Sequence, residues 1–193
     1  MNFLAHFHLS HNNPDLLVGN FVADFIKGSN FDGISPGVVK GIQLHRFIDS
    51  FTDQHPVFLK SKKLLVEYRH YSGVILDVFY DFVLANSWPQ FSDESLLAFS
   101  RTVYKVLDSR RSELTEEAIF ALDHMIEHDW LQGYATKEGI NSALTGLSER
   151  TSFESGMEHA VKVLVEKEKE FEADFSLFYP ELIQVSADYY RAL

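Results

Sequence analysis

Two aspartates stand four residues apart in a stretch that is otherwise apolar or aromatic, from Val74 to Ala85. At helical spacing, Asp77 and Asp81 lie on one face, and a helix that is apolar all round is a buried helix. A buried carboxylate without a partner is strongly destabilising. It must take up a proton, pair with a base or bind a metal ion, so this pair is the first candidate for chemistry.

Two other segments present polar pairs at the same spacing, Asn20 with Asp24 and His45 with Asp49. Helical bundles build metal sites from inward-facing side chains on different helices. Carboxylates with one or two imidazoles suit Mn, Fe, Mg or Zn, and the absence of cysteine favours the harder metals. A structural hydrogen bond is the plainer interpretation of a single His/Asp pair, so the residues alone leave both possibilities open.

Histidines are dense near the N-terminus, where His6 and His8 lie within residues 2–11. The two would share a face in an extended segment but not in a helix. A second group, His128 followed by Asp129, is interpreted as part of a surface helix, because no buried helix with two carboxylates accompanies it.

The elements that must position these residues are all predicted to be helices. Asn13-Pro14 and Ser35-Pro36 are typical helix starts, and no segment shows strand alternation with hairpin turns. The prediction is an all-α, single-domain bundle of about seven to nine helices over residues 1–193. We expect helices at about 14–27, 36–54, 74–88, 92–107, 115–130, 136–147 and 152–178, with a basic helical segment after Pro56 and breaks at Ser72-Gly73 and Pro180.

Composition limits the function. The net charge of −11 argues against nucleic-acid binding, which needs a basic surface, and against docking on anionic membranes. The lack of cysteine excludes disulfides, zinc–thiolate sites and thiol catalysis. The sequence shows neither a signal peptide nor an apolar run long enough to span a membrane, so we expect a soluble, cytoplasmic protein.

Several short motifs together resemble the acyl carrier protein phosphodiesterases, also called acyl carrier protein hydrolases. The resemblance covers nearly the whole chain and is densest before residue 92. It rests on Asn2-Phe3-Leu4-Ala5-His6 with His8, Gly19-Asn20 with Ala23-Asp24, His45-Arg46 with Ile48-Asp49 and Thr52-Asp53, Leu76-Asp77-Val78 with Asp81, and Trp88, Trp130-Leu131, Tyr134, Arg150 and Phe178-Tyr179-Pro180.

The resemblance implies a helical fold distantly related to the metal-dependent HD phosphohydrolases. It also implies hydrolysis assisted by Mn²⁺, with Mg²⁺ or Fe²⁺ as alternatives, that removes 4′-phosphopantetheine from holo acyl carrier protein. One position departs from the pattern, because Phe82 stands where the family has a histidine. Two alternatives follow, namely a metal-dependent hydrolase of a nucleotide or other small phosphoester, and a non-catalytic helical interaction protein.

On this hypothesis Asp24, His45 and Asp77 hold the metal ion. Asp81 or Asp49 accepts a proton from the attacking water, since a carboxylate in a desolvated site can have a raised pKa.

The leaving group is a serine alkoxide of the carrier protein, which His6 or His8 would protonate. Arg46 is expected to hold a phosphate oxygen with its fork of donors, and Asn20 and Asp53 are expected to support the site from beside it.

Docking poses a problem of charge, because acyl carrier proteins and this chain are both acidic. A local basic patch must offset the repulsion. The predicted patch consists of Lys60, Lys62, Lys63 and Arg69.

Overall fold

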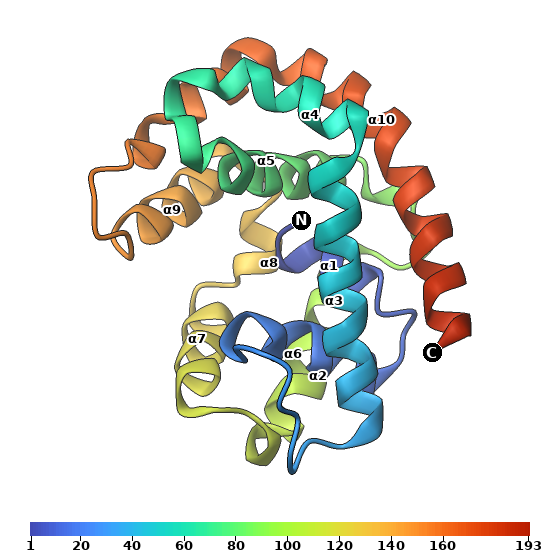
Figure 1. Ribbon diagram of the computed structural model, residues 1–193. Coiled ribbons are helices and arrows are strands. Elements are labelled where there is room, and N and C mark those ends of the chain that lie inside the picture. The colour runs from blue at the N-terminus through green and yellow to red at the C-terminus, as the bar shows by residue number, and fades with distance from the viewer.

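The computed structural model describes residues 1–193 and contains ten α-helices, short 3₁₀ helices and no strand, which confirms the all-α prediction (Figure 1). The α-helices are α1 (Phe3–His8), α2 (Pro14–Val22), α3 (Pro36–Gln54), α4 (Pro56–Lys62), α5 (Ser72–Asn86), α6 (Leu96–Ser109), α7 (Glu116–Glu127), α8 (Trp130–Gly133), α9 (Lys137–Ser148) and α10 (Val161–Ala192). The 3₁₀ helices are η1 (Ala23–Phe25), η2 (Lys63–Tyr71), η3 (Trp88–Gln90), η4 (Arg111–Glu113) and η5 (Met157–His159).

The helix starts follow the predicted capping residues. The side chain of Asn13 accepts from Asp15 N at the start of α2, and that of Ser35 accepts from Val38 N at the start of α3. The α6 helix begins later than predicted, because Ser95 rather than Ser92 caps it. No helix is both long enough and apolar enough to cross a bilayer.

The prediction that Pro180 breaks the last helix is wrong. The α10 helix continues through Pro180 to Ala192. Proline removes one backbone hydrogen bond from a helix, but the residues around it form a buried stripe that includes Phe175, Phe178 and Tyr179. Burying three aromatic side chains stabilises the continuous helix by more than the lost bond costs.

Helix α3 is the axis of the site region. Figure 1 shows α3 running through the middle of the molecule, with α1 behind it and α10 curving along the outside. The α2 and α3 helices cross in contact at Gly19 and Gly41, where a Cβ on Gly19 would overlap a carbonyl oxygen of α3 and lie 2.5 Å from Cα of Gly41. This close crossing brings the C-terminal end of α2 and the adjoining η1 beside the middle of α3.

Candidate functional site

Helix α1 has only six residues, and a buried carboxylate of α5 holds its first turn. Asp81 accepts backbone N–H groups from Leu4 at 2.7 Å and Ala5 at 3.2 Å. These bonds use two of the donors that a helix start leaves without partners. Burial raises the pKa of Asp81 to about 7, against the opposing effect of these N–H groups. Asp81 is 0 % exposed, so its place in the structure is that of an anchor for α1.

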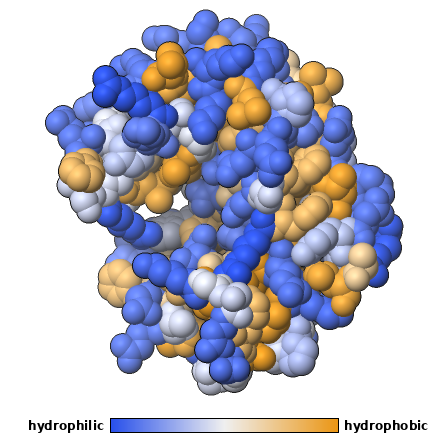
Figure 2. Space-filling view, in the orientation of Figure 1, coloured by the Kyte–Doolittle hydropathy of each residue, from blue (hydrophilic) through white to orange (hydrophobic).

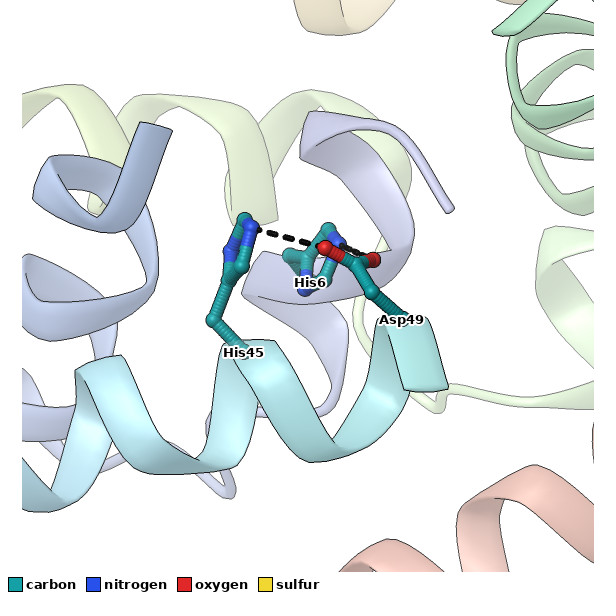
Figure 3. Close-up of side chains that lie close together, drawn as sticks. All are labelled: His6, His45 and Asp49. Carbon is teal, nitrogen blue, oxygen red and sulfur yellow. Dashed lines mark hydrogen bonds and ion pairs between the residues drawn. The ribbon is translucent and has the colours of Figure 1, made fainter. Parts of the chain in front are cut away.

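Three side chains from α1 and α3 meet in one cluster (Figure 3). The carboxylate of Asp49 lies between two imidazoles, with Oδ1 at 3.1 Å from Nε2 of His6 and Oδ2 at 3.1 Å from Nε2 of His45. The two rings stack with centroids 3.9 Å apart. Asp24 of η1 joins the edge of this cluster, with Oδ1 at 3.4 Å from Nε2 of His45.

Acceptor oxygens face both ring nitrogens of His6. Nδ1 faces Oδ1 of Asn20 at 3.2 Å, and Nε2 faces both the carbonyl of Met1 and Oδ1 of Asp49 at 3.1 Å. The amide of Asn20 is oriented by its Nδ2, which donates to Ser10 Oγ. A neutral imidazole has one N–H, so one nitrogen lone pair lies against oxygen. Burial lowers the pKa of His6, which disfavours the charged ring that could satisfy all three acceptors.

The second imidazole has the opposite tendency. Burial lowers the pKa of His45, but the carboxylates of Asp24 and Asp49 outweigh it and raise that pKa to about 9. Burial would raise the pKa of Asp49, whereas its two histidine neighbours hold that pKa well below its usual range. The cluster therefore keeps an ionised carboxylate next to one imidazole that favours the neutral form.

A positive group that sequence patterns did not indicate lies beside the cluster. The amino group of Met1 is 2.9 Å from Oδ1 of Asp77 and 3.5 Å from Oδ1 of Asp49. Burial raises the pKa of Asp77, with this amino group opposing the shift. Asp77, a predicted metal ligand, is thus occupied by the amino group and lies outside the three-residue cluster. The amino group belongs to the backbone, which no side-chain motif marks.

His8 lies apart from the cluster, because residues 3–8 are helical and His6 and His8 diverge around α1. Nδ1 of His8 is 2.8 Å from the hydroxyl of Tyr179, and Nε2 is 3.2 Å from the carbonyl of Phe91. The structure thus gives His8 a role in packing α1 against α10. Phe82, which departs from the family pattern, is 4 % exposed and belongs to the hydrophobic core.

Arg46 points to a loop instead of the cluster. Its guanidinium donates to the carbonyls of Ile26 and Gly28 and lies over the ring of Phe31. It therefore fixes the segment that follows Asp24. The sequence predicted that Asn20 and Asp53 support the site. Asn20 is buried against His6, whereas Asp53 on α3 is exposed and makes no hydrogen bond.

The predicted basic patch is only partly free. Lys60 is paired with the buried carboxylate of Asp174 at 2.6 Å, which ties α4 to α10. Lys62 is half-buried, while Lys63 and Arg69 are exposed on η2 and make no ion pair. Of the four predicted cations, Lys63 and Arg69 are thus both exposed and free of an ion pair, so they can contact an acidic partner.

The donor set fits a divalent metal ion. Metal–ligand bonds of about 2.1 Å place neighbouring donor atoms about 3.0–3.4 Å apart, and the two carboxylate oxygens of Asp49 each lie 3.1 Å from an imidazole nitrogen. An ion at Nε2 of His6 would relieve the crowding of acceptors there and leave Nδ1–H to Asn20, the support that metal-bound histidines usually have.

The fold and this cluster define an all-α protein with a histidine–aspartate site of the kind that could hold a metal ion. A family model described as "Acyl carrier protein phosphodiesterase" matches residues 1–182. The chain belongs to the acyl carrier protein phosphodiesterase family, which confirms the resemblance seen in the sequence.

Curated relatives match over nearly their full length. A protein named acyl carrier protein phosphodiesterase from Photorhabdus laumondii is 29% identical over 192 residues, covering 95% of this chain and 94% of the relative. Proteins of the same name from Salmonella paratyphi A and Salmonella agona are each 30% identical over 189 residues, covering 97% of this chain and 98% of the relatives. No solved structure matches, so the expected likeness to HD phosphohydrolases stays a prediction.

Proposed function

We propose that the protein is a metal-dependent phosphodiesterase that removes 4′-phosphopantetheine from holo acyl carrier protein and leaves the apo form. The family supplies the reaction, because relatives that match end to end carry that name. The metal dependence is supported by the three acceptor oxygens that face the two ring nitrogens of His6. A cation bound at Nε2 would give the oxygens on that side a positive partner.

His6, His45 and Asp49 would hold the ion, and Asp24 would lie beside it at the exposed edge of the cluster. When bound there, a divalent ion supplies Lewis acidity for a phosphodiester oxygen and lowers the pKa of water. We propose Mn²⁺ because imidazole and carboxylate donors without thiolate suit it; Mg²⁺ and Fe²⁺ are the alternatives.

The exposure and contacts of the three carboxylates indicate the role of each in the reaction. Asp24 is 48% exposed at its side chain and makes one contact, to His45, so it is the carboxylate best placed to accept a proton from water. Asp49 is held by both histidines and orients their rings. Asp81 fixes α1, which carries His6. Asp24 therefore takes the role of base that the sequence predicted for Asp81 or Asp49.

The docking surface for the acidic carrier protein is proposed at η2, around Lys63 and Arg69. Long-range attraction raises the encounter rate at low salt. Lys63→Glu should raise KM for holo carrier protein severalfold and leave kcat unchanged. Lys105→Glu makes the same change of charge at an exposed position of α6 and should leave both KM and kcat unchanged. An unaltered KM in the first variant would place docking elsewhere.

The decisive experiment is intact mass spectrometry of holo acyl carrier protein after incubation with this protein. We expect loss of the phosphopantetheine mass with Mn²⁺ and no loss with chelator. Asp49→Asn should abolish the reaction, whereas Asp53→Asn, an exposed carboxylate one turn further along α3, should retain it. Equal activity of these two variants would refute the assignment of the cluster.

The same assay separates the alternatives. If a panel of nucleotides and small phosphoesters were hydrolysed while holo carrier protein was not, the substrate assignment would be wrong. If the folded protein bound no divalent ion and left every substrate intact, a non-catalytic role would replace the proposed one.

A further inference from the structure

A cavity lies between the N-terminus of α1 and helices α8 and α9. Its volume is about 720 Å³, within the range of about 300–1,000 Å³ that small-molecule sites usually have. The lining comes from residues 2–3, from the segment 128–134 and from 139–150. Figure 2 shows the molecule hollowed on the left of the view, between the part that carries α9 and the part that carries α7.

Two residues of the cavity lining, Asn2 and Tyr134, connect the cavity with the surroundings of the cluster. Asn2 lines the cavity, and the residue before it contributes the carbonyl that contacts His6 and the amino group that contacts Asp77. Tyr134 also lines the cavity and is 3 % exposed. Burial raises the pKa of Tyr134 well above its usual value, and the nearby charges of Asp81 and Asp24 add to this shift.

The lining of the cavity has little net charge. Glu149 and Arg150 are neighbours at the end of α9 and are the only carboxylate and the only Lys or Arg in the lining. A polyanion such as a nucleotide would be held by several cations or by a helix N-terminus. The composition of the lining therefore favours a ligand part that is uncharged.

The lining suits a chain that combines amides with apolar groups. The hydroxyls of Ser142 and Thr145 donate to backbone carbonyls within α9, so their oxygens remain able to accept from an amide N–H. The side chain of Asn141 is exposed, makes no hydrogen bond within the protein and offers both a donor and an acceptor. Phe3 and Trp130, with ring centroids 6.3 Å apart, form an apolar wall.

We propose that this cavity binds the pantetheine arm of the substrate, which is an uncharged chain with two amides, a hydroxyl and two methyl groups, while the phosphodiester lies at the His6/His45/Asp49 cluster. The inference rests on the proposed function, because the phosphopantetheine substrate comes from there. It adds a binding site that is separate from the residues that would hold the metal.

Gly146 gives a direct way to fill the cavity. It lines the cavity, and a Cβ added there would meet no atom within 4 Å, so Gly146→Phe should fold and occupy the space. Glu138→Phe adds the same side chain at an exposed position of α9 outside the lining and serves as the matched control. Urea unfolding of both variants confirms that they are folded.

The probe is free 4′-phosphopantetheine, followed by NMR at the two indole N–H groups of the chain. Trp130 lines the cavity, whereas Trp88 is buried and donates its N–H to the carbonyl of Glu94 at 2.7 Å. We expect the probe to shift the Trp130 signal and leave that of Trp88 unchanged. Gly146→Phe should weaken this binding at least tenfold, and Glu138→Phe should bind like the wild type.

Kinetics provide the second readout. Gly146→Phe should raise KM for holo carrier protein at least tenfold and leave the hydrolysis of bis(4-nitrophenyl) phosphate, which has no arm, unchanged. If the wild type released no phosphopantetheine, the proposed function would fail, but the NMR titration would still decide where the arm binds. An unresponsive Trp130 signal, or wild-type binding and kinetics in Gly146→Phe, would overturn the inference.

Discussion

The substitution Asp81→Asn should remove a pH dependence of stability that one buried carboxylate creates. Asp81 is fully buried and accepts two backbone N–H groups of α1. Burial disfavours its charged form, while the N–H groups and the Met1 amino group favour it. Burial dominates, and the pKa of Asp81 rises from 3.8 to about 7.

The magnitude follows from linkage. The pKa of Asp81 differs by about 3 units between the folded and unfolded states, and each unit is worth about 1.4 kcal/mol, which gives about 4 kcal/mol in total. The folded state binds this proton more tightly, so the free energy of unfolding falls as pH rises between 3.8 and about 7. The stabilisation from this proton is fully present below pH 3.8 and is lost above about pH 7.

The assay is urea unfolding of the wild type and of Asp81→Asn, followed by circular dichroism at several pH values. Between about pH 5 and about pH 8, the wild type should lose about 3 kcal/mol relative to the variant, because the amide does not titrate. Other ionisable groups are shared and cancel in the difference. A difference that stays constant with pH would refute the reasoning and show that the N–H groups keep Asp81 ionised.

Three further outcomes are expected. Gly41→Ala should lower the free energy of unfolding by about 1–3 kcal/mol, because its Cβ would lie 2.6 Å from a carbonyl oxygen of α2. Gly146→Ala, whose Cβ would meet no atom within 4 Å, should not destabilise the protein. Urea unfolding measures both variants. Ser61→Ala should cost about 1–3 kcal/mol in the same assay, because it removes a hydroxyl bonded to the buried Asp174, and kcat should not change. Mn²⁺ affinity, measured by calorimetry, should rise about tenfold per pH unit up to about pH 9, because His45, with a pKa of about 9, must release a proton first; a pH-independent affinity would exclude His45 as a ligand.

The sequence predicted α3 and its polar pair closely. Ser35-Pro36 and Pro56 mark both ends of α3, and helical periodicity placed His45 and Asp49 on adjacent turns of a buried face. These features are local, so short-range patterns contain them. The prediction at Pro180 was wrong because aromatic burial, a tertiary effect, outweighed a local signal.

Sequence patterns could not predict the contacts around α1. Six residues are too few for a helical period to distinguish His6 from His8. The partners of Asp77, Asp81 and Arg46 are an amino group, backbone N–H groups and backbone carbonyls, which every residue carries and which no motif marks. Which backbone groups these side chains meet depends on how α1 and the segment after Asp24 pack, and only the three-dimensional structure gives that.

The short α1 helix also makes the site and the N-terminal fold depend on each other. An isolated helix of six residues does not persist in water, so contacts made after folding must hold α1, and those of His6 with Asn20 and Asp49 are among them. A metal ion bound at His6 and Asp49 would bind only the folded arrangement and would stabilise it by mass action. Metal binding and the ordering of α1 should therefore be one coupled equilibrium, and the loss of Asp81 should weaken both.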